Sequence, residues 1–286
     1  MKNRLGMIFM ILHALFMSID TSLLKLCQKS LNIFQVIFSY NLVIITLVYF
    51  FFKDPIILSL KNIKIHFFRS VFGFLGYLLF FFSLRFLPII DSRIILSTDP
   101  IFTSILALYF FKEKINSKKV LGLFFGFLGT VIVLSPNGMS VSLYYILPIL
   151  ASIFFGLFNN FTKKISEGDM VGQLFLLSFF CCIYSFIPSN FLWTIPSIND
   201  CLLIVSISIS FVLSSFCSFM AYKNAEVSCL MPLHSIGIIF TALIGVIFFK
   251  ESISNSTFIG ATIIIVGSTL PFLQKKQVCS LSKVLK

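Results

Sequence analysis

The chain has 286 residues, of which 58% are hydrophobic and only 11% are charged, and its mean hydropathy is +1.04. Soluble domains carry about 25% charged residues, so this composition excludes a soluble protein and indicates one that is surrounded by membrane lipid. The net charge is +12, and an excess of this size indicates nucleic-acid binding when the basic residues form one face of a folded domain. Here the lysines and arginines lie in short gaps between apolar runs, so no nucleic-acid partner is expected.

Ten apolar segments follow one another along the chain. Because a hydrocarbon core of about 30 Å requires about 20 apolar residues in a helix, each segment is predicted to cross the membrane. The first segment has the basic start of a signal peptide, but its apolar run is too long and lacks a small-residue cleavage site, so we interpret it as a retained span. The predicted spans are 5–26, 34–52, 67–86, 89–111, 118–136, 142–163, 170–191, 201–222, 227–249 and 256–273.

Lysines and arginines are distributed unevenly between the two sides of this predicted bundle. If the N-terminus is cytoplasmic, 17 of the 22 fall on the cytoplasmic side and 5 on the outer side. Positive residues are enriched in cytoplasmic loops, so the distribution predicts ten spans with both termini in the cytoplasm. The five outer residues are Lys25, Lys29, Arg85, Arg93 and Lys250.

The second half of the chain repeats the first at an offset of 138 residues. Phe110–Ile115 (FFKEKI) matches Phe248–Ile253 (FFKESI). In the same register, two glycines of the fifth span match two of the tenth: Gly122 with Gly260, and Gly129 with Gly267.

Each repeat contains five spans, an odd number, so the second half must enter the membrane inverted relative to the first. Inverted repeats are typical of secondary transporters, whose halves rock about a site near the midplane. We assign residues 1–138 to the first repeat, 139–275 to the second and 276–286 to a basic cytoplasmic tail.

Residues 67–115, followed by 122–136, resemble one EamA repeat of the drug/metabolite transporter superfamily. The matching features are a glycine-rich third span followed by Leu-Pro, the S-x-D-P-I-F sequence of the fourth span, the acidic residue that closes that span, and the glycines of the fifth. The second half repeats the ending at 248–268. The resemblance implies an all-α integral membrane fold of ten helices, arranged as two inverted five-helix repeats around a central cavity.

Within this superfamily, the segments 150–164 and 231–234 are most similar to the S-adenosylmethionine uptake carriers of obligate intracellular bacteria. Two departures from the family pattern bear on the cavity. Residues 37–40 lack the arginine of the phenylalanine-arginine pair that commonly opens the second span, and a charged residue before Pro100 is unusual.

Asp99 is the first candidate for substrate binding, because a charge near the middle of a span is unfavourable in lipid and usually faces a cavity. Pro100 removes a backbone hydrogen bond beside it, and a carboxylate next to freed carbonyls suits an ammonium, a sulfonium or a proton. The alternative is a structural pair between Asp99 and an arginine or lysine on a neighbouring helix.

Further candidates lie in the first helix of each repeat. Asp20 either faces the cavity or pairs with Lys25 near the outer surface. Lys25 and its repeat equivalent Lys163 either bind a substrate carboxylate or extend to the membrane interface. Asn159 and Asn160 either donate hydrogen bonds to the substrate or join neighbouring helices.

The ninth span carries Pro232 and His234, which predict a helix break and a side chain that titrates near neutral pH. A hydrogen-bonded packing histidine is the alternative. Glu113 and Glu251, the acids of the two FFKE sequences, are interpreted as helix-end charges that fix depth or act in gating rather than as substrate ligands.

These features predict a secondary transporter for a small polar metabolite, with S-adenosylmethionine uptake as the specific hypothesis and export of an amino acid or related compound or drug as the alternative. An intramembrane enzyme is disfavoured because the sequence lacks H-E-x-x-H, G-x-S-x-G and paired histidines, and no cofactor or metal is expected. An accessory membrane subunit is a third hypothesis. The expected partners are a small-molecule substrate and lipid, the expected location is the bacterial inner membrane, and both a monomer and a homodimer are compatible with the sequence.

Overall fold

The computed structural model describes residues 2–51, 62–99, 101–103, 105–106, 117–134, 142–165, 170–191, 193–224, 230, 233 and 236–269. The elements in these ranges are all helical: ten α-helices and one 3-10 turn. In chain order they are α1 (Lys2–Cys27), α2 (Ile33–Phe51), α4 (Ile63–Phe86), α5 (Ile89–Leu96), α7 (Ser117–Leu134), η2 (Leu143–Tyr145), α8 (Ile146–Lys164), α9 (Met170–Phe191), α10 (Ile198–Asn224), α12 (Ile236–Phe249) and α13 (Asn255–Thr269).

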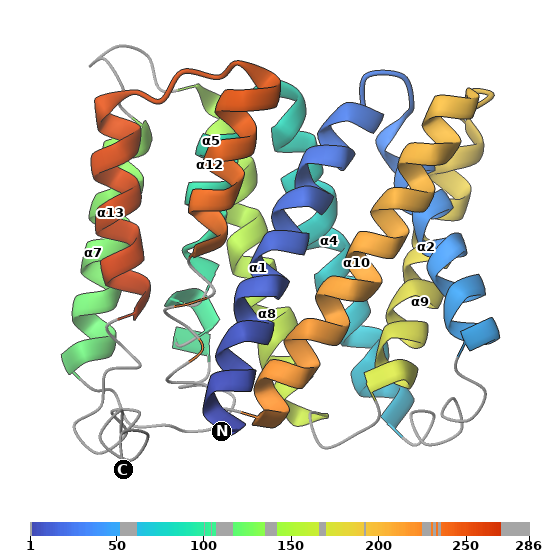
Figure 1. Ribbon diagram of the computed structural model, residues 1–286, viewed down its shortest axis with the longest axis horizontal. Coiled ribbons are helices and arrows are strands. Elements are labelled where there is room, and N and C mark those ends of the chain that lie inside the picture. Colours follow the sequence, from blue (N-terminus) through green and yellow to red (C-terminus); the bar gives the residue numbers. More distant parts are fainter. Residues whose placement is uncertain are drawn as a thin grey trace.

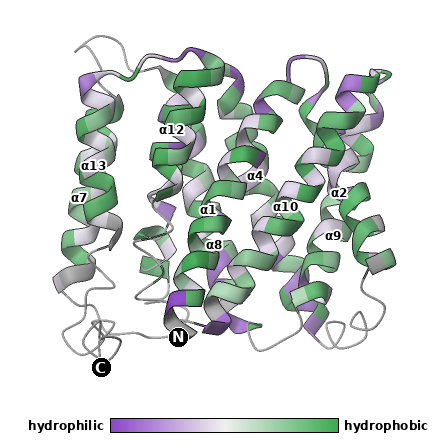
Figure 2. Cartoon of the chain, viewed as in Figure 1, coloured by the Kyte–Doolittle hydropathy of each residue, from purple (hydrophilic) through white to green (hydrophobic). Residues whose placement is uncertain are grey.

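Most of these helices are suited to a membrane by length and by surface. Among the described residues, six helical stretches are long and apolar enough to span a bilayer, and three more apolar helices are shorter. Hydrophobic residues run along the helices while hydrophilic residues gather towards their ends (Figure 2). Large apolar side chains also face outward in mid-helix, such as Phe127 on α7, which is 73% exposed. A surface of this kind requires lipid, so the chain is a multi-pass membrane protein.

The predicted fourth span, 89–111, is not one continuous helix. Helix α5 ends at Leu96, and a tight turn follows in which the N–H of Thr98 donates to the carbonyl of Ile95 at 3.1 Å. Helical residues resume at Asp99. A proline has no N–H to bond the carbonyl four residues earlier, so Pro100 leaves Leu96 without its helical partner, and α5 ends at Leu96.

The helix pairs follow the internal repeat. Helix α1 packs along α10, and their repeat equivalents α8 and α4 pack along each other. Two further pairs join equivalent helices directly, α2 with α9 and α7 with α13. These two pairs lie at opposite edges of the molecule, and α1 begins at the same end of the bundle at which α13 ends (Figure 1).

The glycines matched by the repeat meet each other between α7 and α13. A Cβ atom on Gly129 would lie 2.8 Å from the carbonyl oxygen of Gly260, and one on Gly267 would lie 3.0 Å from that of Gly122. Only glycine permits backbones to approach this closely. Since the contacts join the beginning of α7 to the end of α13, the two equivalent helices run antiparallel, as an inverted repeat requires.

Candidate functional site

Asp20, the acid of the first helix, is buried in the protein. Its side chain is 3% exposed, and its Oδ1 atom has no hydrogen-bond partner. The suggested pairing with Lys25 is wrong, because the Lys25 ammonium lies 2.6 Å from Glu251 Oε1 instead. The charge of Arg93 acts on Asp20 instead.

Glu251 joins the ends of three helices. Helix α12 ends at Phe249, Lys250 follows in the left-handed region at φ 55°, and the N–H of Glu251 donates to the carbonyl of Gly245 at 3.1 Å. Glu251 Oε1 accepts the N–H of Ile89 at 2.9 Å, and Oε2 accepts that of Ile90 at 3.3 Å. The carboxylate therefore caps the N-terminus of α5, where the helix dipole favours an anion, while it binds Lys25 at the end of α1.

A second polar cluster lies near α5 at the same end of the bundle. Asp91 accepts hydrogen bonds from the Tyr145 hydroxyl at 3.0 Å and from the Thr257 hydroxyl at 3.1 Å. These contacts tie α5 to η2 and to α13. Together, the Glu251 and Asp91 contacts hold four helix ends together, so we call these two groups the outer polar contacts, after the side that the charge distribution predicts.

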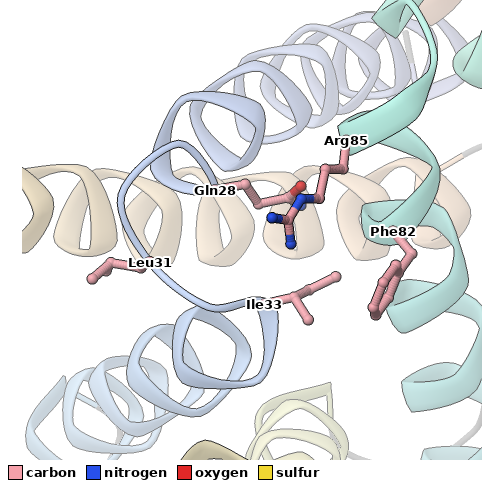
Figure 3. A pocket seen from close by; sticks show the side chains of 5 residues that line it. All are labelled: Gln28, Leu31, Ile33, Phe82 and Arg85. Carbon is pink, nitrogen blue, oxygen red and sulfur yellow. The ribbon is translucent and has the colours of Figure 1, made fainter. Parts of the chain in front are cut away.

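Arg85 also lies at this end, where its guanidinium faces Gln28 beside a small cavity of about 10 Å³ (Figure 3). This volume holds about one water molecule and is too small for a metabolite. The cavity is therefore not a candidate substrate site.

Asp99, the leading candidate, is linked to the second repeat. Asn159 of α8 donates to Asp99 Oδ2 at 3.4 Å and to the Thr103 hydroxyl at 3.2 Å. The neighbouring Asn160 donates to the carbonyls of Thr103 and Gly156, at 3.0 and 2.8 Å. The amide nitrogen of Asn160 is thus occupied by backbone groups, which favours helix joining for that residue, whereas Asn159 reaches the acid itself.

Arg93 is a candidate site residue that the sequence did not single out. The charge count placed it among the outer residues, but it lies in α5 with only 4% of its surface exposed, because α5 is covered by neighbouring helices. Its charge acts on Asp99, Tyr77 and Asp20. The alternative of a direct ion pair with Asp99 is not observed, because no guanidinium nitrogen lies within 4.0 Å of either carboxylate. A signal was available, since Arg93 lies inside the predicted span 89–111.

Aromatic rings line the same region. The ring of Tyr77 on α4 lies 4.9 Å from Phe155 of α8 and 5.9 Å from Phe211 of α10, measured between centroids. Tyr40 of α2 lies 6.2 Å from Phe211. The charge of Asp20 acts on both tyrosines. We call Tyr40, Tyr77, Phe155 and Phe211 the aromatic wall; it supplies flat apolar surface in the region that the charge of Asp20 reaches.

The structure leaves several predicted residues without a described position. Pro100, Pro232, His234 and Glu113 lie outside the described residues. Lys163 lies in the last turn of α8, but its side chain is outside the described part of the chain. His13, on α1, accepts or donates a hydrogen bond at Nδ1 with the hydroxyl of Ser214, at 2.8 Å.

Two other features limit the chemistry. A cavity of about 200 Å³ lies between α2, α9 and α10, at the end of the bundle where α1 begins, but its lining is entirely apolar, which does not suit a polar ligand. Within the described ranges, no three His, Cys, Asp or Glu side chains are grouped so that they could hold a metal ion.

Comparison with known proteins gives a consistent result. Residues 4–135 and 142–273 each match the EamA-like transporter family. A protein of Rickettsia bellii named S-adenosylmethionine uptake transporter is 24% identical over 248 residues, covering 86% of this chain and 84% of its own length. A pseudopaline exporter of Pseudomonas aeruginosa is 20% identical and covers 92% of this chain and 94% of its own length. A crystal structure with 13% sequence identity superposes with a TM-score of 0.60 over 94% of this chain and 96% of the other, a likeness of fold alone.

Proposed function

Because the chain belongs to the EamA-like transporter family, we propose that it is a secondary transporter that carries S-adenosylmethionine into the cell by alternating access. The family consists of transporters, which confirms the prediction that the chain is not an enzyme. Transport of a small molecule follows from the family, and the identity of the molecule is the proposal. Support comes from the Rickettsia relative, whose name states this substrate.

One observation carries the mechanism: Asp99 of the first repeat is hydrogen-bonded to Asn159 of the second, in a partly buried position next to a helix break. A partly buried acid at the seam between two inverted halves is available to a cationic substrate when the halves separate on either side. S-adenosylmethionine carries a sulfonium and an ammonium. Asp20 and Asp99 provide the opposite charge, and the aromatic wall provides surface for the purine.

Alternating access requires contacts that form on one side and break on the other. The outer polar contacts are the candidates for the outer gate, because they join helix ends from both repeats. We assign the FFKE sequence at Glu113 and the lysine Lys163 to the equivalent inner gate by repeat symmetry. Pro100, Pro232 and His234 remain proposed cavity residues on the sequence argument.

The proposed setting is the bacterial inner membrane, crossed ten times, with both termini in the cytoplasm. The excess of positive residues on one side supports this orientation. Export of an amino acid or a related compound is the second candidate, and the exporter among the relatives favours it.

The direct test is uptake of labelled S-adenosylmethionine into proteoliposomes that contain the purified protein. We expect saturable uptake that is competed by unlabelled substrate and absent from empty liposomes. Asp99→Asn should lower the uptake at subsaturating substrate by about tenfold or more, since a hydrogen bond to a charged group contributes about 1.5–3 kcal/mol. The control Asp54→Asn, in the hydrophilic gap after the second span, should leave uptake unchanged. Absence of uptake, with efflux of another compound, would favour the exporter.

A further inference from the structure

Among the residues that the structure describes, Asp20, Arg93 and Asp99 are the ionisable groups of the seam, and all three belong to the first repeat. At the offset of 138 residues, the counterparts of Asp20, Arg93 and Asp99 are Phe158, Met231 and Gly237, none of which is charged. The second repeat contributes uncharged groups, including Asn159 and the Phe155 and Phe211 rings. The seam is therefore polarised, with positive and negative groups on one side and apolar and amide groups on the other.

Arg93 and Asp20 are buried ionisable side chains that make no hydrogen bond in the described part of the chain. Arg93 Nε and Asp20 Oδ1 are both buried and make no hydrogen bond, and the exposed fractions of the two side chains are 4% and 3%. Their groups attract each other, but no nitrogen of Arg93 comes within 4.0 Å of the Asp20 carboxylate. A buried charge is strongly unfavourable unless it is paired and hydrogen-bonded. Two ionisable groups of opposite charge type that interact and are both left without hydrogen bonds are the arrangement expected of a site that awaits its ligand.

The backbone is shaped to hold the Arg93 guanidinium at this place. Gly237 of α12 occupies the repeat position of Asp99, and a Cβ atom there would lie 3.2 Å from Arg93 Nη2. The missing side chain makes room for the guanidinium between α5 and α12. Close by, the Ser18 hydroxyl donates to the carbonyl of Gly237 at 3.0 Å, so this carbonyl is already occupied.

We propose that Arg93 and Asp20 together bind the α-amino acid head group of the substrate, with the Arg93 guanidinium on its carboxylate and the Asp20 carboxylate on its ammonium. This inference rests on the proposed transport function and defines the substrate class of the same site. Carboxylate and ammonium are borne by one carbon atom in such a head group, so one ligand satisfies both buried charges through charge-assisted hydrogen bonds of about 2.8 Å. A planar guanidinium matches a carboxylate in two-point geometry, which makes Arg93 the residue that determines specificity.

The rest of the substrate lies against the aromatic wall. Asp20 interacts electrostatically with Tyr77 and Tyr40, and a cation held between the acid and these rings gains cation–π attraction. S-adenosylmethionine meets all these requirements, because it combines an α-amino acid head group, a sulfonium and a purine. The head-group site itself does not depend on the purine.

The first test compares ligands that differ only in the carboxylate, and it needs no mutation. We expect S-adenosylmethionine to bind purified protein about 10- to 100-fold more tightly than decarboxylated S-adenosylmethionine, in isothermal titration and by thermal shift. 5′-Methylthioadenosine, which lacks the head group, should bind more weakly still. Equal affinities for the first two compounds would overturn the proposal.

The second test removes the guanidinium. Arg93→Gln should weaken binding of S-adenosylmethionine by about 10- to 100-fold and leave binding of decarboxylated S-adenosylmethionine within about twofold of the original protein. Arg93→Lys keeps the charge but loses the planar geometry, and should recover part of the preference for S-adenosylmethionine over the decarboxylated compound. The lysine variant replaces the glutamine variant in this test if the latter does not fold. Arg85→Gln, at an exposed arginine that faces Gln28, is the matched control and should change neither affinity.

A third set of ligands separates this proposal from the choice of substrate. The protein is screened by thermal shift against the common amino acids, each paired with the amine that lacks its carboxylate. If S-adenosylmethionine does not bind, stabilisation by another amino acid that depends on Arg93 supports the head-group site and refutes only the substrate. If S-adenosylmethionine is transported but Arg93→Gln binds it as well as the original protein does, the head-group site is refuted and the function stands.

Discussion

Replacement of Glu251 by glutamine should open the outer side of the bundle. Glu251 forms an ion pair with Lys25 at 2.6 Å, and its oxygens also accept the N–H groups of Ile89 and Ile90. Glutamine retains an oxygen acceptor for the backbone and removes the negative charge. Because Ile89 and Ile90 donate to different oxygens of Glu251, the substitution removes the charge together with one backbone hydrogen bond.

The structure sets the size of the expected effect. The two side chains are 18% and 13% exposed, so the pair lies between a surface pair, worth about 0.2–1 kcal/mol, and a fully buried one, whose disruption costs about 3–5 kcal/mol. Loss of a negative charge at the N-terminus of α5 adds about 0.3–1 kcal/mol. A total of about 1–3 kcal/mol corresponds to a shift of about 5- to 150-fold towards the conformation that is open on this side.

Cys27, the last residue of α1, is a native reporter for this opening, since it is fully buried and lies two residues after Lys25. Peptide mass spectrometry follows the labelling of Cys27 by a membrane-impermeant maleimide. The labelling rate should rise in proportion to the fraction of molecules that are open on this side. Lys25→Gln should have a similar effect, and the double variant should be no more open than the single ones. The control is Lys250→Gln, at the exposed residue next to Glu251, and it should leave the labelling rate of Cys27 unchanged. Unchanged Cys27 labelling in Glu251→Gln would refute the assignment of this pair to a gate.

Two further substitutions test the packing that holds the halves together. Gly129→Ala should lower the stability of the protein in detergent by about 1–3 kcal/mol, because the new Cβ would lie 2.8 Å from the carbonyl oxygen of Gly260 and this clash outweighs the helix preference of alanine. The control Val131→Leu, at a lipid-facing residue, should have little effect. A Gly129→Ala protein that is as stable as the original would contradict the close contact. Asn160→Ala should lower stability by about 1–3 kcal/mol and leave the KM of uptake unchanged, because its amide bonds backbone carbonyls. Asn159→Ala should instead raise the KM of uptake. If Asn160→Ala raised KM and Asn159→Ala lowered only stability, the roles of the two asparagines would be exchanged.

Much of the fold was predictable because lipid imposes simple requirements. Long apolar runs identified the first three spans and the sixth to eighth to within a few residues, as for α9, whose bounds of 170 and 191 agree with the prediction. The offset of 138 residues also predicted which glycines would be equivalent, and these glycines form the α7–α13 contact. The pairing of equivalent helices follows from an approximate two-fold relation that the sequence repeat already contains.

The site was less predictable because it depends on contacts between distant residues. Lys25 and Glu251 are 226 residues apart, so the sequence offered only the nearby Asp20 as an alternative partner of Lys25. Counting arginines by loop treated Arg93 as an outer charge, although the interruption at Ser97 and Thr98 makes α5 a short helix that neighbouring helices cover. The acids Asp20 and Asp99 were recognised because a carboxylate within an apolar span is conspicuous by itself.

The central claim is that the two halves of the chain lie inverted in the membrane around this charged seam, and the sidedness of equivalent helix ends tests it most directly. Lys29→Cys, after the end of α1, and Lys164→Cys, at the end of α8, both replace exposed residues at equivalent ends of the two repeats. In intact cells, an impermeant thiol reagent should label the cysteine at position 29, and should label that at position 164 only after the membrane is permeabilised. Labelling of both from the same side would contradict the inverted arrangement and, with it, the alternating seam.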